Sequence, residues 1–155
     1  MQLLHEAQTQ VLSVAAPQVA TVPLEDSLGQ VLSDDIISPQ SSPAFSNSAM
    51  DGYAIRAADL EPGSPLTVIG TAWAGKPHPG AVANGECVRI MTGAVMPEHA
   101  DTVVMQEQVA LLDDKIRVAP GQKTGQHVRH AGEDLAAGEL ALRAGQRLAP
   151  GALGL

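Results

Sequence analysis

Aromatic side chains are scarce in this sequence, which has one phenylalanine (Phe45), one tyrosine (Tyr53) and one tryptophan (Trp73) in 155 residues. A chain of this length corresponds to one domain or two small ones and is long enough to bury a core. Aliphatic side chains must fill that core, and each of them buries less area than an aromatic ring. We therefore expect modest stability, or burial of part of the chain against a partner surface.

Cysteine is limited to Cys87, which excludes an intrachain disulfide and a cysteine metal cluster. A lone cysteine is typical of a reducing compartment. The first residues show no basic segment followed by an apolar one, and no apolar run reaches transmembrane length. These features predict a cytoplasmic protein that does not bind membranes.

Basic residues are also few, with 9 Lys and Arg against 17 Asp and Glu, a formal net charge of -8. Nucleic-acid binding and docking on anionic lipid both need clustered basic side chains, so neither is expected. Any anionic ligand must be held by a local site, because the overall field repels it.

The first 37 residues predict a helix and two short strands. Apolar residues recur at helical spacing from Leu3 to Ala15, and Pro17 ends the pattern. This stripe must dock on another part of the protein, because an isolated helix of that length is not stable alone. Strands are expected at 19–22 and 34–37, with a short helix over 24–32 between them.

Serine and proline dominate residues 38–48, which predicts a loop and a domain boundary. From Met50 onward, short apolar runs alternate with Gly and Pro, as in a small barrel or sandwich. Asp113-Asp114 marks the turn of a hairpin. The strands expected in this part are 52–56, 66–71, 86–91, 102–108, 109–112 and 115–118.

Three local patterns remain ambiguous when each is taken alone. Asp51-Gly52 is typical of a turn, since Asp tolerates and Gly favours positive φ. Gly70 to Lys76 matches the first seven positions of a phosphate-binding loop, but Pro77 replaces the required hydroxyl residue, so we interpret the segment as a glycine loop. His127 and His130 are interpreted as a surface pair and not as metal ligands, because the flanking glycines disfavour a helix.

Three ordered segments together carry a family resemblance. They are 45–54 (FSNSAMDGYA), 88–107 (VRIMTGAVMPEHADTVVMQE) and 125–134 (GQHVRHAGED). The sequence resembles the N-terminal region of the molybdopterin molybdenumtransferase family, to which the E domain of gephyrin belongs.

The resemblance implies a mainly β fold with a short N-terminal helix, in which a small β-barrel-like domain is inserted in a mixed α/β linker domain. Residues 1–17 would form the helix, which docks on a domain beyond this chain. Residues 18–45 and 131–155 would form the mixed domain, and residues 46–130 the β-rich domain. The large α/β domain and the C-terminal barrel domain of the family would follow Leu155.

The resemblance also implies a reaction. Family members insert molybdate into adenylylated molybdopterin and release AMP, as homodimers that use Mg²⁺, whose ligands would lie mostly outside this chain. The adenylyltransferase that acts upstream is an expected partner. Carried over by position, Asp51 and Thr92 would be catalytic residues in a cleft, where Thr92 donates to a phosphate or molybdate oxygen.

Four further residues are expected to bind substrate: Arg129, Asp134, Ser48 and Gly93. For Arg129 and Asp134, an ion pair that is purely structural is the slightly favoured alternative. The sequence departs from the family where Ser46 replaces an Asp and where His130-Ala131 replaces basic residues. This chain alone is expected to be inactive, and a non-catalytic dimerisation or scaffold module is the alternative function.

Overall fold

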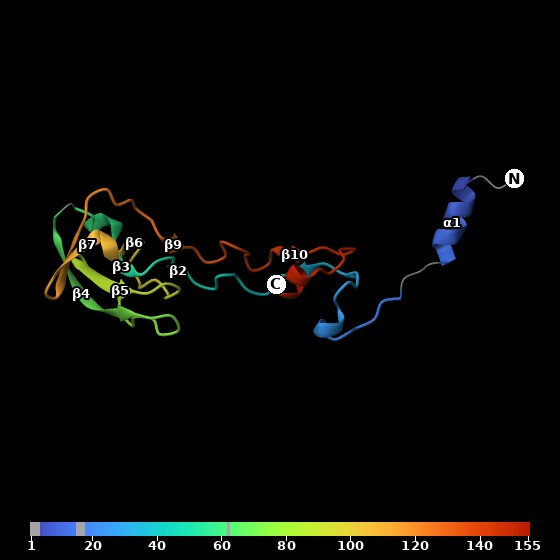
Figure 1. Cartoon of the computed structure of the whole chain (residues 1–155), viewed down its shortest axis with the longest axis horizontal. Coiled ribbons are helices and arrows are strands. Elements are labelled where there is room, and N and C mark those ends of the chain that lie inside the picture. The colour runs from blue at the N-terminus through green and yellow to red at the C-terminus, as the bar shows by residue number, and fades with distance from the viewer. Residues whose placement is uncertain (1–3, 15–17, 62) are drawn as a thin grey trace. The chain divides into compact units, whose positions relative to one another are not determined.

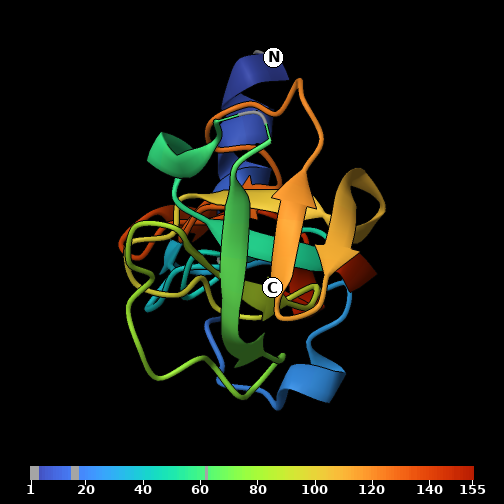
Figure 2. The same ribbon diagram turned by 90° about the vertical axis from the view of Figure 1, so that its left-hand side faces the viewer.

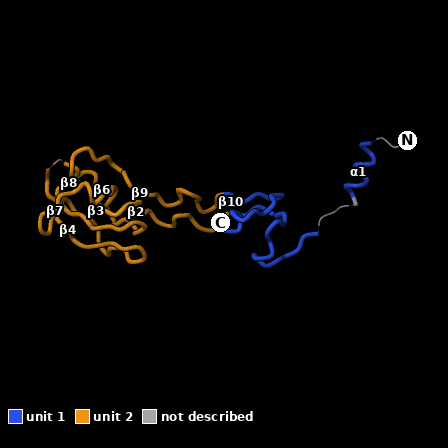
Figure 3. Tube along the Cα trace, in the orientation of Figure 1, with its two compact units in different colours: residues 1–36, 140–155 blue, residues 37–139 orange. Residues whose placement is uncertain are grey.

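The computed structural model describes residues 4–14, 18–61 and 63–155, and the chain forms two compact units. The first unit consists of residues 1–36 and 140–155, and the second of residues 37–139 (Figure 3). The second unit is thus inserted between two segments of the first. The β-rich domain predicted over 46–130 lies within it.

The first unit contains little regular structure. Helix α1 (Leu4–Val14) confirms the predicted amphipathic helix, and Leu4, Val11 and Leu12 are exposed on it. The end predicted at residues 15–17 lies outside the described residues. A two-stranded sheet forms from β1 (Ile36–Ile37) and β10 (Leu140–Leu142), and α2 (Pro150–Leu153) is a single turn.

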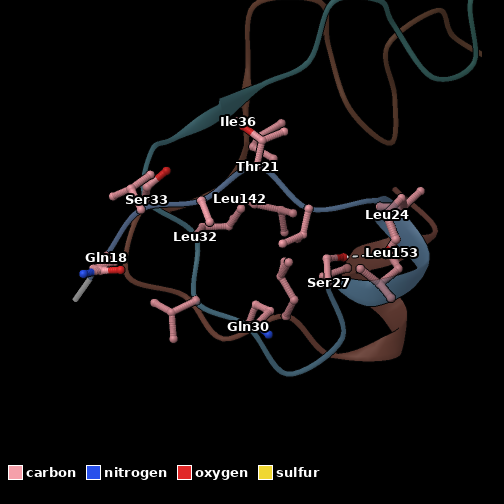
Figure 4. A pocket seen from close by; sticks show the side chains of 16 residues that line it. Gln18, Thr21, Leu24, Ser27, Gln30, Leu32, Ser33, Ile36, Leu142 and Leu153 are labelled. Atoms are coloured by element: carbon pink, nitrogen blue, oxygen red, sulfur yellow. Dashed lines mark hydrogen bonds between the residues drawn. The ribbon is translucent and has the colours of Figure 1, made fainter.

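Two predictions for the first unit were wrong. Residues 19–22 form no strand, and no backbone hydrogen bond joins them to another described segment. The helix predicted over 24–32 is only a 3-10 turn at Leu24–Asp26, after which Gly29 takes a positive φ of 80°. Apolar residues of segment 19–32, including Leu32, instead line a groove of about 660 Å³ together with Leu142 and Leu153 (Figure 4).

The second unit is built on a six-stranded sheet whose strand order is β6-β3-β5-β4-β8-β7. All its pairs are antiparallel except β4 with β5, which is parallel. Figure 2 shows β4, β8 and β7 running steeply across β3 and β6, so the sheet curls into half a barrel. The strands are β3 (Gly52–Ile55), β4 (Pro65–Ala72), β5 (Glu86–Ile90), β6 (Thr102–Met105), β7 (Val109–Leu112) and β8 (Lys115–Val118).

These bounds confirm most of the predicted strands, and the Asp113-Asp114 turn joins β7 to β8 as expected. Asp113 takes a φ of 51°, which Asp tolerates in tight turns. The strand predicted over 102–108 was too long, because Gln106–Gln108 form a 3-10 turn that separates β6 from β7. The Ser/Pro-rich segment is also not all loop, since it contains β2 (Asn47–Ser48), which pairs with β9 (Val128–Arg129).

Aliphatic side chains cover both faces of the sheet, as the scarcity of aromatics requires. Tyr53, the only aromatic in the core, packs on one face with Cys87 and Val104. The other face carries a second cluster that includes Val88 and Ile90. Burial raises the pKa of the Cys87 thiol to about 12, so this thiol remains protonated and unreactive near neutrality. The described residues contain no helix long and apolar enough to cross a membrane.

Candidate functional site

The three motifs of the sequence meet around the short strand β2. One edge of β2 pairs with β9 of the third motif, through Asn47 with Arg129 and Ser48 with Val128. The other edge contacts the second motif, where the N–H of Ser48 donates to the carbonyl of Ala94 over 3.0 Å. Figure 1 shows β2 and β9 side by side at the end of the sheet where β3 begins. The fold thus brings together segments separated by about 80 residues.

Asp51 and Thr92 are in direct contact at this end of the sheet. Asp51 Oδ1 accepts the backbone N–H of Thr92 at 2.8 Å and its hydroxyl at 2.7 Å. A carboxylate can only accept, so the Thr92 hydroxyl must donate its proton here. The N–H of Thr92, and then its hydroxyl, lower the pKa of the Asp51 carboxyl. An exposed, ionised carboxylate is therefore held in one orientation, and its Oδ2 takes no part in these two bonds.

The dipeptide Asp51-Gly52 alone indicated a positive-φ turn, but neither residue has a positive φ in the structure. Gly52 starts β3 and is buried. A Cβ built on it would lie 2.1 Å from the carbonyl oxygen of Val104 in the neighbouring strand. Glycine is therefore needed here for close backbone approach, which sets Asp51 at the edge of the sheet.

Arg89 supports Asp51 from β5, and the sequence did not single it out as a site residue. Its Nη1 donates to the carbonyl of Gly52 at 2.7 Å, and its Nη2 donates to Gln106 Oε1. The guanidinium also lies over the Tyr53 ring, 5.2 Å from the centroid. The N–H of Gln106 in turn donates to the Asp51 carbonyl. Arg89 therefore bonds both Gly52, which follows Asp51 in the chain, and Gln106, which bonds the Asp51 backbone. The alternation around Val88 and Ile90 was the only sequence signal for its direction.

Ser48 and Gly93 shape the loop that carries Asp51. The Ser48 side chain is buried, and its hydroxyl donates to the Met50 carbonyl at 2.6 Å. The N–H of Gly93 donates to the Ser48 carbonyl at 2.8 Å, and Gly93 takes a φ of 78°. Both groups are thus engaged within the protein, and their role in substrate binding stays a prediction.

Arg129 and Asp134 also lie together, on the side of β2 that pairs with β9. Arg129 Nη2 is 2.6 Å from Asp134 Oδ1, and its Nε is 3.3 Å from Glu133 Oε1. The pKa of Arg129 is raised, mainly by its hydrogen bond with Asp134 and then by that with Glu133. The pKa of Glu133 is lowered, mainly by the hydrogen bond that it accepts from the N–H of His130. Ser46, in place of the family's Asp, accepts the N–H of Ala131 at 3.3 Å. Arg129 is therefore already paired with two carboxylates.

The described residues hold no cluster of three or more metal-ligating side chains. Mg²⁺ in enzymes that act on phosphorylated substrates commonly takes one or two carboxylates, several waters and the substrate's phosphates. Asp51 Oδ2 fits one such contact. In such sites, waters and substrate phosphates supply most of the remaining contacts.

A model of the family described as "MoeA N-terminal region (domain I and II)" matches residues 3–155, nearly the whole chain. This chain belongs to the MoeA N-terminal family. The mainly β fold with a curled sheet is the fold of solved MoeA proteins.

Relatives of this MoeA N-terminal chain are named molybdopterin molybdenumtransferase. The Haemophilus influenzae protein is 43% identical over 133 residues, which is 85% of this chain and 33% of the relative. Molybdopterin molybdenumtransferase 2 of Mycobacterium tuberculosis is 39% identical over 140 residues, or 87% of this chain and 35% of the relative. The chain thus spans about a third of the length of the curated relatives it matches.

A solved structure agrees with the sequence relatives. The molybdopterin biosynthesis moeA protein of Pyrococcus horikoshii OT3 superposes with a TM-score of 0.81 at 37% identity, covering 87% of this chain and 37% of that one. Both curated relatives carry the name of a transferase that acts on molybdopterin.

Proposed function

We propose that the full-length protein inserts molybdate into adenylylated molybdopterin and releases AMP, and that this chain supplies one wall of the site. The contact between Asp51 and Thr92 carries the proposal. This contact links two residues that are 41 positions apart in the sequence. It gives the exposed, ionised Asp51 carboxylate a fixed orientation. Such a group can accept hydrogen bonds from a substrate or hold a metal-bound water.

In this mechanism the two residues have different roles. Asp51 faces the substrate through Oδ2, and its low pKa keeps it charged across the physiological range. Thr92 positions Asp51, because its donors are directed at Oδ1 and not at a phosphate or molybdate oxygen. Mg²⁺, held in part by Asp51, would neutralise phosphate charge when it is bound.

Several features of the family extend this proposal. The protein works as a cytoplasmic homodimer in which this chain faces a large α/β domain of the partner subunit, and it receives substrate from the upstream adenylyltransferase. Arg129, Asp134, Ser48 and Gly93 contribute to the substrate-binding wall. The chain alone is inactive, because the principal substrate domain lies outside it.

The test is molybdate-dependent cofactor formation by the full-length protein. Asp51→Asn and Thr92→Val are expected to lower the rate by at least about tenfold, because a hydrogen bond to a charged group typically contributes about 1.5–3 kcal/mol. Thr92→Ser is the matched control, because it keeps both the hydroxyl and the N–H. If Asp51→Asn and Thr92→Val both leave the rate unchanged, the assignment of this site is wrong.

A second candidate function is a non-catalytic dimerisation or scaffold module. The exposed apolar side chains of α1 and the apolar groove in the first unit favour it, because such surfaces commonly bind other proteins. Light scattering of the chain over a dilution series tests it. A molecular mass of one chain at every concentration contradicts a module that dimerises on its own.

A further inference from the structure

Trp73 lies at the same end of the sheet as Asp51 and Thr92. It directly follows β4, which runs parallel to β5 with Ala72 opposite Ile90. The N–H of Met91, the residue before Thr92, donates to the Ala72 carbonyl at 3.1 Å. Because the ends of neighbouring parallel strands lie about 5 Å apart, the backbone of Trp73 lies beside the Met91-Thr92 segment.

A tight turn fixes Trp73 next to Lys76. The N–H of each residue donates to the carbonyl of the other, at 3.0 and 2.9 Å, and Gly75 between them takes a φ of 77°. Side chains of such a directly opposite pair lie on the same face of the ribbon. The turn therefore presents an indole and an ammonium group side by side.

The turn is also held against the site. A Cβ on Gly93 would lie 3.9 Å from the Cβ of Ala74, so the tip of the turn packs next to the loop that follows Thr92. At its base, the His78 ring lies so close to Gly70 that a Cβ there would be 2.8 Å from it. Contacts at the tip and at the base of the turn thus hold its backbone in place beside the Met91-Thr92 segment.

Strand alternation places Trp73 on the same face of the sheet as Arg89. Ala72 is buried in the core cluster of one face, so its neighbours Thr71 and Trp73 point to the other face. That face is the one on which Arg89, opposite Thr71, reaches toward Gly52 and Tyr53. Trp73 is 50% exposed there, although the chain has only three aromatic residues to fill its interior.

We propose that Trp73 and Lys76 form a substrate-binding element of this site, in which the indole stacks on a planar heteroaromatic ring and Lys76 pairs with an attached phosphate. The proposal rests on the function proposed above. The substrate named there carries two such rings, a pterin and an adenine, each linked to phosphate. Indole faces stack on either ring, and an ammonium group binds phosphate as a point charge.

The first test is the kinetics of the full-length protein. Trp73→Ala is expected to raise KM for adenylylated molybdopterin about tenfold, the loss of one ring stack, while Trp73→Phe keeps most of the affinity. Leu111→Ala, another exposed apolar residue on the far strand β7, is the matched control. A KM within twofold of wild type for Trp73→Ala overturns the proposal and leaves the proposed function intact.

The second test uses the 155-residue chain, in which Trp73 is the single tryptophan. AMP and a free uncharged pterin are titrated separately while indole fluorescence is followed, with Trp73→Phe as the blank for light absorbed by the ligand. Saturable quenching by AMP that Lys76→Ala weakens identifies the adenine, and quenching by the pterin that Lys76→Ala leaves unchanged identifies the pterin. Quenching that stays linear for both ligands, as for free N-acetyltryptophanamide, contradicts ring binding.

The two tests separate the proposals. If the full-length protein forms no cofactor but the chain shows saturable quenching, the proposed function fails and the ring-binding element stands. If the full-length protein is active and Trp73→Ala matches Leu111→Ala in KM, the ring-binding element fails alone.

Discussion

Gly52 lies so close to Val104 that the two backbones leave no room for a side chain. A Cβ on Gly52 would be 2.1 Å from the Val104 carbonyl oxygen and 3.1 Å from the Met105 Cα. This contact holds β3 against β6 at the point where Asp51 leaves the sheet. The glycine of the Asp-Gly pair thus fixes the position of the carboxylate through packing and not through an unusual φ.

Gly52→Ala is therefore expected to destabilise the second unit by about 3 kcal/mol, the upper part of the usual range for overpacked interiors, since backbone must move to admit the methyl group. Urea denaturation followed by far-UV circular dichroism measures this change. Gly80→Ala is the control, because a Cβ there would lie 3.4 Å from His78, an ordinary contact. Equal stabilities for the two variants would contradict the packing argument.

Asp51 gives the protein a pH-dependent stability. Its pKa in the folded protein is lowered from 3.8, first by the N–H of Thr92 and then by its hydroxyl. A depressed pKa stabilises the fold above the unfolded value of 3.8, and this contribution is lost as pH falls through the folded pKa. Asp51→Asn is expected to be less stable than wild type at pH 7. The difference in the free energy of unfolding between the two proteins should disappear as the pH falls below 3.8.

Denaturant midpoints measured between pH 7 and pH 2.5 show this convergence. Glu61→Gln removes one negative charge from an exposed position of the same unit and serves as the control. A gap between wild type and Asp51→Asn that stays constant over the whole pH range is inconsistent with an ionised, hydrogen-bonded Asp51.

Much of the fold follows from the sequence because Gly, Pro and Asp mark where the strands end. Five of the six sheet strands begin and end close to the expected residues, and the Asp113-Asp114 turn is local information. The strand predicted at 19–22 was wrong because a strand exists only with a partner, and pairing partners are not visible in a local pattern. The end of β6 at Met105 was missed because Gln106 turns to donate to the Asp51 carbonyl, a contact between distant segments.

The residues of the site were likewise only partly predictable from the sequence. Asp51 and Thr92 were singled out by family resemblance, yet the register that makes them contact, with Gly52 opposite Ile90, is a property of the folded sheet. Arg89 was not predicted as a site residue, because its acceptors, a backbone carbonyl and Gln106, leave no pattern in the sequence. Trp73 lay within a segment interpreted as a glycine loop, and its place beside the site depends on contacts between distant segments, such as the hydrogen bond of Met91 to Ala72.

The ion pair of Arg129 and Asp134 is expected to contribute little to stability. Both side chains are partly exposed, and solvent screens such pairs. A double-mutant cycle with Arg129→Met and Asp134→Asn should give a coupling of about 0.2–1 kcal/mol that shrinks as salt rises. A coupling that is larger and insensitive to salt contradicts the view of a solvent-screened pair. In the full-length protein, a raised KM with unchanged stability would instead assign Arg129 to the substrate.

Arg89 is expected to be the most important charged residue for the stability of the sheet. Arg89→Met removes hydrogen bonds to the Gly52 carbonyl and Gln106 and the contact with the Tyr53 ring. Hydrogen bonds from charged groups typically contribute about 1.5–3 kcal/mol, so a loss of that size is expected in urea denaturation. Arg89→Lys should fall between wild type and Arg89→Met, since it keeps the charge but not the planar fork.

Arg117→Met is the matched control, since it is the same substitution at an exposed position of β8 in the same sheet. It should change stability by no more than about 0.5 kcal/mol. Because the Arg89 charge also helps to lower the pKa of Asp51, Arg89→Met should raise that pKa relative to wild type, as measured by NMR titration of the Asp51 carboxyl. If Arg89→Met and Arg117→Met are equally stable, Arg89 does not hold the backbone around Asp51, and the Thr92 hydrogen bonds alone orient the carboxylate.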